Sequence, residues 1–145
     1  MTVAELLRSK KDQRVFTVRE DDTIADAAAM LKEHGIGALP VCGAEGQLLG
    51  VISERDMIGG MVARGAAVLS LRVSDLMTRR VIVCKPTDSV KEAMAVMSRS
   101  HIRHLPVMDE GKLRGVISQR DVMKSQLEQT QLEVNVLRDY ALAKG

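Results

Sequence analysis

Apolar residues recur with the period of an α-helix in two stretches of the chain. A spacing of i, i+3, i+4 and i+7 places such residues on one helical face, which can then be buried. This spacing is followed by Ile24, Ala27, Ala28 and Leu31, and again by Val90, Ala93, Met94 and Met97. A capping-box signal precedes each stretch, Thr23 with Asp26 and Ser89 with Glu92, and Gly35 follows the first. We therefore predict two helices that begin at these caps, the first of which ends at the glycine.

Short runs of β-branched and aliphatic residues flank each predicted helix. Residues 15–18 and 81–84 precede the helices and are predicted to be strands. Two further apolar runs follow each helix, with a glycine-containing turn between them, and this order predicts a β-hairpin. The runs of the two hairpins are 36–41 with 47–52, and 102–108 with 112–117. A second helix is expected to begin at Ser53 in one half and at Ser118 in the other.

The matching order of elements reflects an internal repeat. Residues 50–56 read GVISERD and residues 115–121 read GVISQRD, while residues 15–41 align with residues 81–107 at an offset of 66. Two copies of one β-α-β-β-α unit, related by an approximate twofold axis, are therefore predicted, which gives an α/β (α+β) fold. The expected divisions are a first repeat with its N-terminal lead-in, a second repeat and a C-terminal helical extension, at residues 1–66, 67–125 and 126–145.

The C-terminal extension is predicted to continue a single long helix. Neither glycine nor proline occurs from Ser118 to Lys144. An a/d spacing is followed by Leu127, Thr130, Val134, Leu137 and Ala141. This stripe can pack back on its own repeats or on a second protomer, and we favour the second protomer.

Composition argues against nucleic-acid binding and membrane insertion. The 145 residues are 46% hydrophobic and carry a formal net charge of +2, with acidic and basic residues interspersed. Phe16 and Tyr140 are the only aromatic residues, so few bases could stack on this protein. No run approaches membrane-spanning length, and the first residues lack the apolar core of a signal peptide. Cys42 and Cys84 form no disulfide or metal pattern, and we expect a cytoplasmic protein.

The ordered motif set resembles the cystathionine-β-synthase (CBS) domain. A strand, a capped helix, I-x-x-L-P-V, a glycine turn and L-x-G-V-I-S-x-R-D occur twice within residues 1–125. Two CBS domains in tandem form a Bateman module, so the resemblance implies a stand-alone module of bacterial type. It further implies two clefts between the repeats that bind adenosyl ligands such as AMP, ADP, ATP, S-adenosylmethionine or NAD. A non-catalytic, homodimeric regulator is implied, one that needs no cofactor and acts on an unidentified effector protein.

The G-h-h-S-x-x-D motif supplies the central candidates for ligand binding. A carboxylate can accept both hydroxyls of a ribose, as the resemblance implies for Asp56 and Asp121. Ser53 and Ser118 begin helices, where the dipole favours phosphate. The alternative is that each serine–aspartate pair only caps its helix. The full expected ligand-binding set is Ser53, Arg55, Asp56, Ser118, Arg120, Asp121, Arg103, His104, Gly37, Ala38, Pro40, Pro106, Thr17 and Val83.

The two copies differ where the first strand of each hairpin begins. The second copy reads HIRHLPV at 101–107, and the first reads GIGALPV at 35–41. The resemblance assigns a phosphate-binding role to Arg103 and His104, of which Arg103 is preferred because its guanidinium is permanently charged and forks onto phosphate. The alternative is that Arg103 is a solvated strand residue. The small residues of the first copy could make room for the base or for a larger ligand.

Three other functions compete with nucleotide sensing. The clefts could be vestigial in a structural or protein-interaction module. A nucleic-acid-binding regulator could use the short basic runs at 8–14 and 78–80, although such runs are more often solvated loops. A nucleotide-processing enzyme is disfavoured because no P-loop, acid–base pair or metal cluster is visible, and two histidines three apart on a strand point to opposite faces.

Overall fold

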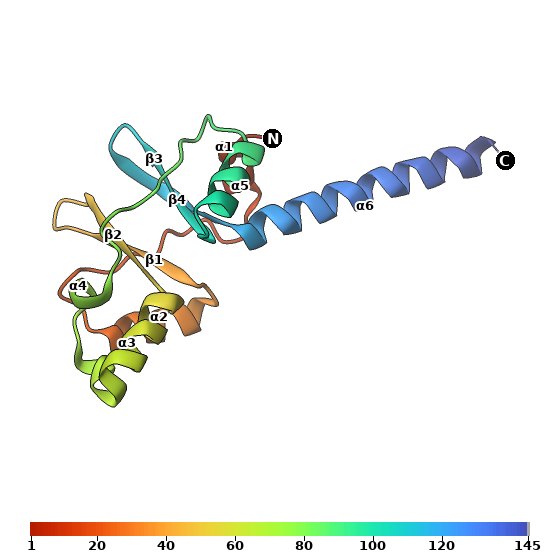
Figure 1. The fold of residues 1–145 in the computed structure, drawn as a ribbon. Helices are drawn as coiled ribbons and strands as arrows, with labels where there is room; N and C mark the ends of the chain where they lie inside the picture. Colours follow the sequence, from red (N-terminus) through yellow and green to blue (C-terminus); the bar gives the residue numbers. More distant parts are fainter. Residues whose placement is uncertain (145) are drawn as a thin grey trace.

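The computed structural model describes residues 1–144 and contains two units with the same order of elements (Figure 1). The first unit comprises α2 (Ile24–His34), β1 (Ala38–Cys42), β2 (Leu48–Ser53) and α3 (Glu54–Arg64). The second comprises α5 (Val90–Arg99), β3 (His104–Asp109), β4 (Lys112–Ser118) and α6 (Gln119–Lys144). The remaining elements are α1 (Val3–Ser9), the 3-10 helix η1 (Gly65–Ser70) and α4 (Val73–Leu76). The predicted fold class, two repeats followed by a long C-terminal helix, is confirmed.

The helix caps form at the predicted positions. The Thr23 hydroxyl accepts a hydrogen bond from the Asp26 amide at 3.2 Å, and the Ser89 hydroxyl accepts one from the Glu92 amide at 3.0 Å. Gly35 ends α2 in the left-handed region at φ 61°. The equivalent residue after α5 is His101, which adopts φ 54° although it has a side chain. His101 therefore lies in a helix-ending turn, and the expectation that it shares a strand with His104 is wrong, because β3 begins at His104.

The predicted strands at 15–18 and 81–84 are wrong, because each segment makes only one parallel bridge. Val18 pairs with Val41, and Cys84 pairs with Val107. Val18 donates to the carbonyl of Pro40 at 3.0 Å. To extend the parallel ladder toward the N-terminus, the Phe16 carbonyl would have to accept from the amide of Pro40. Proline has no N–H, so the ladder stops there. Pro106 ends the bridge of Cys84 in the same way.

The two antiparallel hairpins have equivalent registers. Leu39 lies opposite Ile52, and Leu105 lies opposite Ile117. Each hairpin has a register shift after the valine of its first strand, at Val41/Cys42 and Val107/Met108. The shorter turn, at 109–112, places Glu110 and Gly111 at positive φ, and the longer turn uses Gly46 at φ 81°. The difference of one residue between the two copies is therefore accommodated in the turns.

Each hydrophobic core is completed by the short helix that leads into the other repeat. Val3 and Leu6 of α1 are fully buried in the second core, beside Leu105 and Ile117. Val73, at the start of α4, is fully buried in the first core. Backbone hydrogen bonds join the same segments: the Val3 amide donates to the Asp88 carbonyl at 2.9 Å, and the Val73 amide donates to the Asp22 carbonyl at 2.8 Å. The two repeats therefore cannot form their complete cores independently.

The outer strands of the hairpins are bounded differently in the two repeats. In the first, Val51 and Thr78 exchange two backbone hydrogen bonds of 2.9 Å. In the second, the Val116 carbonyl accepts instead from the Lys10 ammonium at 3.0 Å. The longer lead-in of the first copy thus supplies a side chain where the second copy's lead-in supplies backbone.

Helix α6 projects away from both repeats (Figure 1). Among the described residues of α6, Val122 in the first turn is buried, and the large apolar side chains farther along the helix are exposed. Within residues 1–144, no helix combines the length and apolar character required to cross a membrane.

The glycines that precede the motif valines provide a matched test of this packing. A Cβ on Gly50 would lie 2.7 Å from the Thr78 carbonyl oxygen, whereas one on Gly115 would meet only the end of the Leu7 side chain, at 2.9 Å. Because backbone cannot move aside as a leucine can, we expect Gly50→Ala to lower the free energy of unfolding by about 1–3 kcal/mol and Gly115→Ala to lower it less. Urea unfolding of both variants measures the difference. Equal losses would show that the Thr78 contact does not constrain this position.

Candidate functional site

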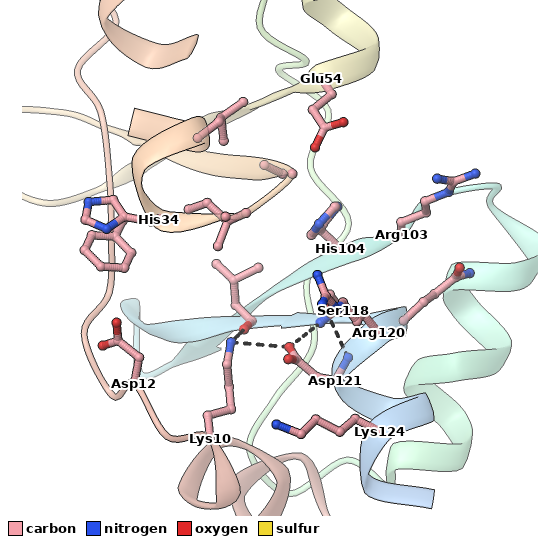
Figure 2. Close-up of a pocket in the computed structure, with 18 of the residues that line it drawn as sticks. Lys10, Asp12, His34, Glu54, Arg103, His104, Ser118, Arg120, Asp121 and Lys124 are labelled. Carbon is pink, nitrogen blue, oxygen red and sulfur yellow. Dashed lines mark hydrogen bonds and ion pairs between the residues drawn. The ribbon is translucent and has the colours of Figure 1, made fainter. Parts of the chain in front are cut away.

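A cleft of about 1740 Å³ lies between the two repeats (Figure 2). Its walls come from the start of β1 in the first repeat and from the start of α6 in the second. The volume exceeds that of an ordinary small-molecule pocket. The predicted site residues that line it are Gly37, Ala38, Pro40, Arg103, His104, Ser118, Arg120 and Asp121. Residues 63 or more positions apart in the sequence thus meet in one site.

The start of α6 holds Asp121 in a fixed orientation. The Asp121 amide donates to the Ser118 hydroxyl at 3.1 Å, and the Ser118 amide donates to Asp121 Oδ2 at 2.9 Å. The Lys10 ammonium lies 3.3 Å from the same oxygen. Within residues 1–144, the other oxygen, Oδ1, accepts no hydrogen bond. The helix cap therefore uses one carboxylate oxygen and leaves the second able to accept other hydrogen bonds, so capping and ligand binding are compatible roles.

The backbone of Arg103 is attached to the same helix start. The Gln119 amide donates to the Arg103 carbonyl at 2.9 Å. Arg103 is exposed, which agrees with the alternative that it is a solvated residue, but it also lines the cleft, as does Arg120. Two guanidinium groups therefore stand at one cleft, next to the positive end of the α6 dipole.

Asp56 lies outside this cleft and has partners on both of its oxygens. Oδ2 accepts from the Ser53 amide at 2.9 Å and from the Ser53 hydroxyl at 3.0 Å, while Oδ1 accepts from the Thr78 hydroxyl at 3.3 Å. Arg55 donates across the repeats to the His101 carbonyl at 3.1 Å. Arg55 and Asp56 line a second, smaller cleft of about 670 Å³, together with Arg64 and Asp75.

Four other predicted residues line neither of these two clefts. Ser53 caps α3, and Pro106 is buried in β3, where its carbonyl accepts from Cys84 at 3.0 Å. Thr17 and Val83 occupy equivalent exposed positions, one residue before the single bridges of Val18 and Cys84. A ligand-binding role for these four stays a prediction.

Gly37 leaves room for the His104 ring of the other repeat. A Cβ at this position would lie 2.9 Å from Glu54 Oε1 and 3.0 Å from His104 Cε1. The His104 ring therefore occupies space that any other residue at 37 would restrict. Burial lowers the pKa of His104, and the nearby carboxylates of Glu54 and Asp121 only partly oppose this effect. The imidazole is consequently held toward its neutral form.

Charge is distributed unequally between the two clefts. Six permanently basic side chains line the larger cleft, against three carboxylates: Lys10, Arg14, Lys32, Arg103, Arg120 and Lys124, against Asp12, Glu54 and Asp121. The smaller cleft is lined by two basic and two acidic side chains, namely Arg55, Arg64, Asp56 and Asp75. The larger cleft is therefore the one suited to an anionic ligand.

Sequence reasoning missed an aromatic wall of the larger cleft. The rings of Phe16 and His34 stack with centroids 3.7 Å apart and an interplanar angle of 14°, and the Arg14 guanidinium lies 5.0 Å from the Phe16 centroid. Arg14 also forms hydrogen bonds with Asp12 that hold the pKa of this carboxyl well below its usual range. The only signals for this wall were the single phenylalanine and the basic run at 8–14, which also contains Lys10.

Metal-binding and thiol chemistry find little support in the described residues. Residues 1–144 contain no group of three or more histidine, cysteine, aspartate or glutamate side chains placed to hold a metal ion. Cys42 and Cys84 are buried free thiols. Burial raises the pKa of both, that of Cys84 to about 11, which disfavours the reactive thiolate.

Comparison with known proteins identifies the repeat unit. The family model described as "CBS domain" matches residues 3–63 and again residues 73–128. The CBS domain-containing protein CBSX3, mitochondrial, of Arabidopsis thaliana is 31% identical over 146 residues, which cover 96% of this chain and 71% of that protein. The crystal structure of the CBS-domain protein ATU1752 from Agrobacterium tumefaciens has a TM-score of 0.83 and 38% identity, covering 87% of this chain and 99% of that one.

A second similar structure contains ligands. The CBS domain pair of protein MJ0100, in complex with 5′-methylthioadenosine and S-adenosyl-L-methionine, has a TM-score of 0.77 and 25% identity. The match covers 89% of this chain and 98% of that one.

The partly buried His104 ring predicts a pH dependence of stability. The unfolded chain takes up a proton near the ordinary histidine pKa of about 6.5, whereas the folded state does so only at lower pH. The free energy of unfolding should therefore decrease as the pH falls below about 6.5. In His104→Gln, urea unfolding at pH 7.5 and pH 5 should show a smaller decrease than in the unchanged protein. An NMR titration that places the pKa of His104 above its ordinary value would contradict this assignment.

Proposed function

Because the chain belongs to the CBS domain family, we propose that it is a non-catalytic regulatory module that binds an adenine nucleotide in the larger cleft. The observation that carries the proposal is Asp121, whose Oδ1 is without a hydrogen-bond partner among residues 1–144, in a cleft with an excess of basic side chains. The family is generally non-catalytic, and one similar CBS pair binds adenosyl ligands.

The chemistry of the cleft matches the three parts of such a ligand. Asp121 offers carboxylate oxygens to the ribose hydroxyls. Arg103 and Arg120 offer charged donors to phosphate, beside the positive end of α6. Ile36 and Pro40 supply apolar surface for the base. AMP, ADP, ATP and NAD each combine these parts, and we propose ligands of this class.

A regulatory role follows from the origin of the cleft walls. Asp121 and Arg103 belong to the second repeat, whereas Gly37 and Pro40 belong to the first. A ligand that contacts both walls stabilises one relative orientation of the repeats over others. An effector protein that binds one orientation better would then respond to the nucleotide concentration.

A nucleotide panel tests the proposed function. AMP, ADP and ATP should raise the melting temperature, and guanine and pyrimidine nucleotides should raise it less. At a free concentration about 100 times Kd, binding adds roughly 2.7 kcal/mol to the free energy of unfolding, which thermal shift detects readily. A flat response across the panel would favour an interaction module with vestigial clefts.

Paired aspartate variants separate ligand binding from helix capping. Asp121→Ala and Asp56→Ala each remove one cap, and each should lower stability by about 1 kcal/mol. Only Asp121→Ala should also abolish most of the nucleotide response of the larger cleft. If both variants keep the full response, the carboxylates serve only as caps.

We further propose that α6 pairs with α6 of a second copy. Leu127 and Leu137 are 71% and 67% exposed, and Val134, which is also exposed, continues their stripe at an a position. Within a parallel coiled coil, a β-branched residue at a followed by leucine at d favours two strands. In that pair, Glu133 at g faces Arg138 at e of the partner helix. In an antiparallel pair with the same core residues, the two Glu133 side chains would face each other.

Charge exchange on α6 tests the parallel pair. Leu137→Glu should raise the dimer Kd at least about tenfold, since burial of a leucine contributes about 1.5–3 kcal/mol, whereas Leu132→Glu on the opposite face should change it little. Glu133→Arg should weaken the dimer, and the added change Arg138→Glu should restore it. Sedimentation over a range of concentrations measures each value. A monomer throughout, or equal effects at 132 and 137, would exclude this pairing.

A further inference from the structure

Lys10 occupies a position in the larger cleft that no sequence motif assigned to it. Its ammonium lies 3.3 Å from Asp121 Oδ2 and donates to the Val116 carbonyl at 3.0 Å (Figure 2). Lys10 belongs to the lead-in of the first repeat, yet both of its partners belong to the second. Its side chain keeps one third of its surface exposed, so it can leave this position without unfolding the site.

The acceptor capacity of Asp121 gives this contact a consequence for binding. A carboxylate oxygen accepts about two hydrogen bonds. Those of Oδ2 are taken by the Ser118 amide, at 2.9 Å, and by the Lys10 ammonium. A ribose diol that places one hydroxyl on each oxygen therefore needs Lys10 to leave Oδ2. A ligand without a negative charge offers the displaced ammonium no substitute for this ion pair.

We propose that Lys10 makes the Asp121 cleft selective for phosphorylated adenosines over neutral ones. When the ribose displaces Lys10 from Asp121, a phosphate of the same ligand supplies the anion that the ammonium then contacts. AMP and ATP exchange one ion pair for another, whereas adenosine and 5′-methylthioadenosine lose one. The inference rests on the proposed binding of adenine nucleotides to this cleft.

The other motif aspartate, Asp56, has no ion pair among the described residues like that between Lys10 and Asp121, so the proposed selectivity applies to the Asp121 cleft alone. Asp56 accepts from two neutral hydroxyls, that of Thr78 on Oδ1 and that of Ser53 on Oδ2, and makes no ion pair within residues 1–144. Displacing a hydroxyl breaks no ion pair, so binding at Asp56 carries no such preference for a charged ligand. The two clefts differ in selectivity although their motifs are nearly identical.

A purely structural role for Lys10 is the competing explanation. The ammonium also donates to the Val116 carbonyl. In the first repeat the equivalent carbonyl, that of Val51, accepts from the Thr78 amide instead. Loss of the bond from Lys10 lowers stability whether or not Lys10 affects ligands. A structural role, however, changes the affinities of adenosine and AMP by the same factor.

Calorimetric titration with adenosine, 5′-methylthioadenosine and AMP tests the proposal. The measurements use an Asp56→Ala background, so that the measured affinity is that of the Asp121 cleft alone. Lys10→Met should tighten the two neutral ligands several-fold and weaken AMP, which lowers the ratio of AMP to adenosine affinity by about tenfold or more, the size of one charge-assisted hydrogen bond. Lys10→Arg should keep most of the original ratio.

Lys124→Met is the matched control, because Lys124 lines the same cleft but makes no ion pair with Asp121. It should not tighten adenosine. An equal change for adenosine and AMP in Lys10→Met would assign Lys10 a structural role and overturn the proposal. The same tightening of adenosine in Lys124→Met would also overturn it, since a general field effect would then suffice. If AMP binds neither the lysine variants nor the protein that keeps both lysines, the proposed function itself is wrong.

Discussion

The exchange of lead-in helices between the repeats is the constraint on which the rest of the structure depends. Val3 and Leu6 complete the second core, and Val73 completes the first, so each repeat buries apolar side chains supplied by the other's lead-in. The chain must therefore cross between the repeats twice. These crossings bring Lys10 to Asp121 and Thr78 to Asp56, and they create the different surroundings of the two motif aspartates.

The helix cap uses a single oxygen of Asp121. Oδ2 accepts from the Ser118 amide, while Oδ1 accepts no hydrogen bond from residues 1–144. A folded helix N-terminus thereby orients the carboxylate before any ligand arrives, and preorganisation of this kind lowers the cost of binding. The same motif at Asp56 has partners on both oxygens, so identical letters in the sequence do not specify identical sites.

The sequence predicted what depends on local pattern and missed what depends on contacts between the repeats. The caps at Thr23 and Ser89, the left-handed Gly35 and the long final helix follow from short-range rules, and all are observed. The strand at 15–18 failed because the proline that limits it lies more than 20 positions away. Gly37, Arg103 and Asp121 line one cleft, a grouping across the two repeats that the sequence did not predict. Lys10 could not be placed there either, because nothing local indicates which repeat a lead-in joins.

Helix α6 connects the site to a distant point. Its 26 residues span about 39 Å at 1.5 Å per residue, and the cleft lies against its N-terminal part, from Gln119 to Thr130. A rigid rod held at one end converts rotation into displacement in proportion to its length. A tilt of about 5° at Asp121 would move Lys144 by about 3 Å, comparable to the rise of two residues along a helix. Small adjustments around a bound ligand would thus become, at the tip, a movement large enough to make or break a contact.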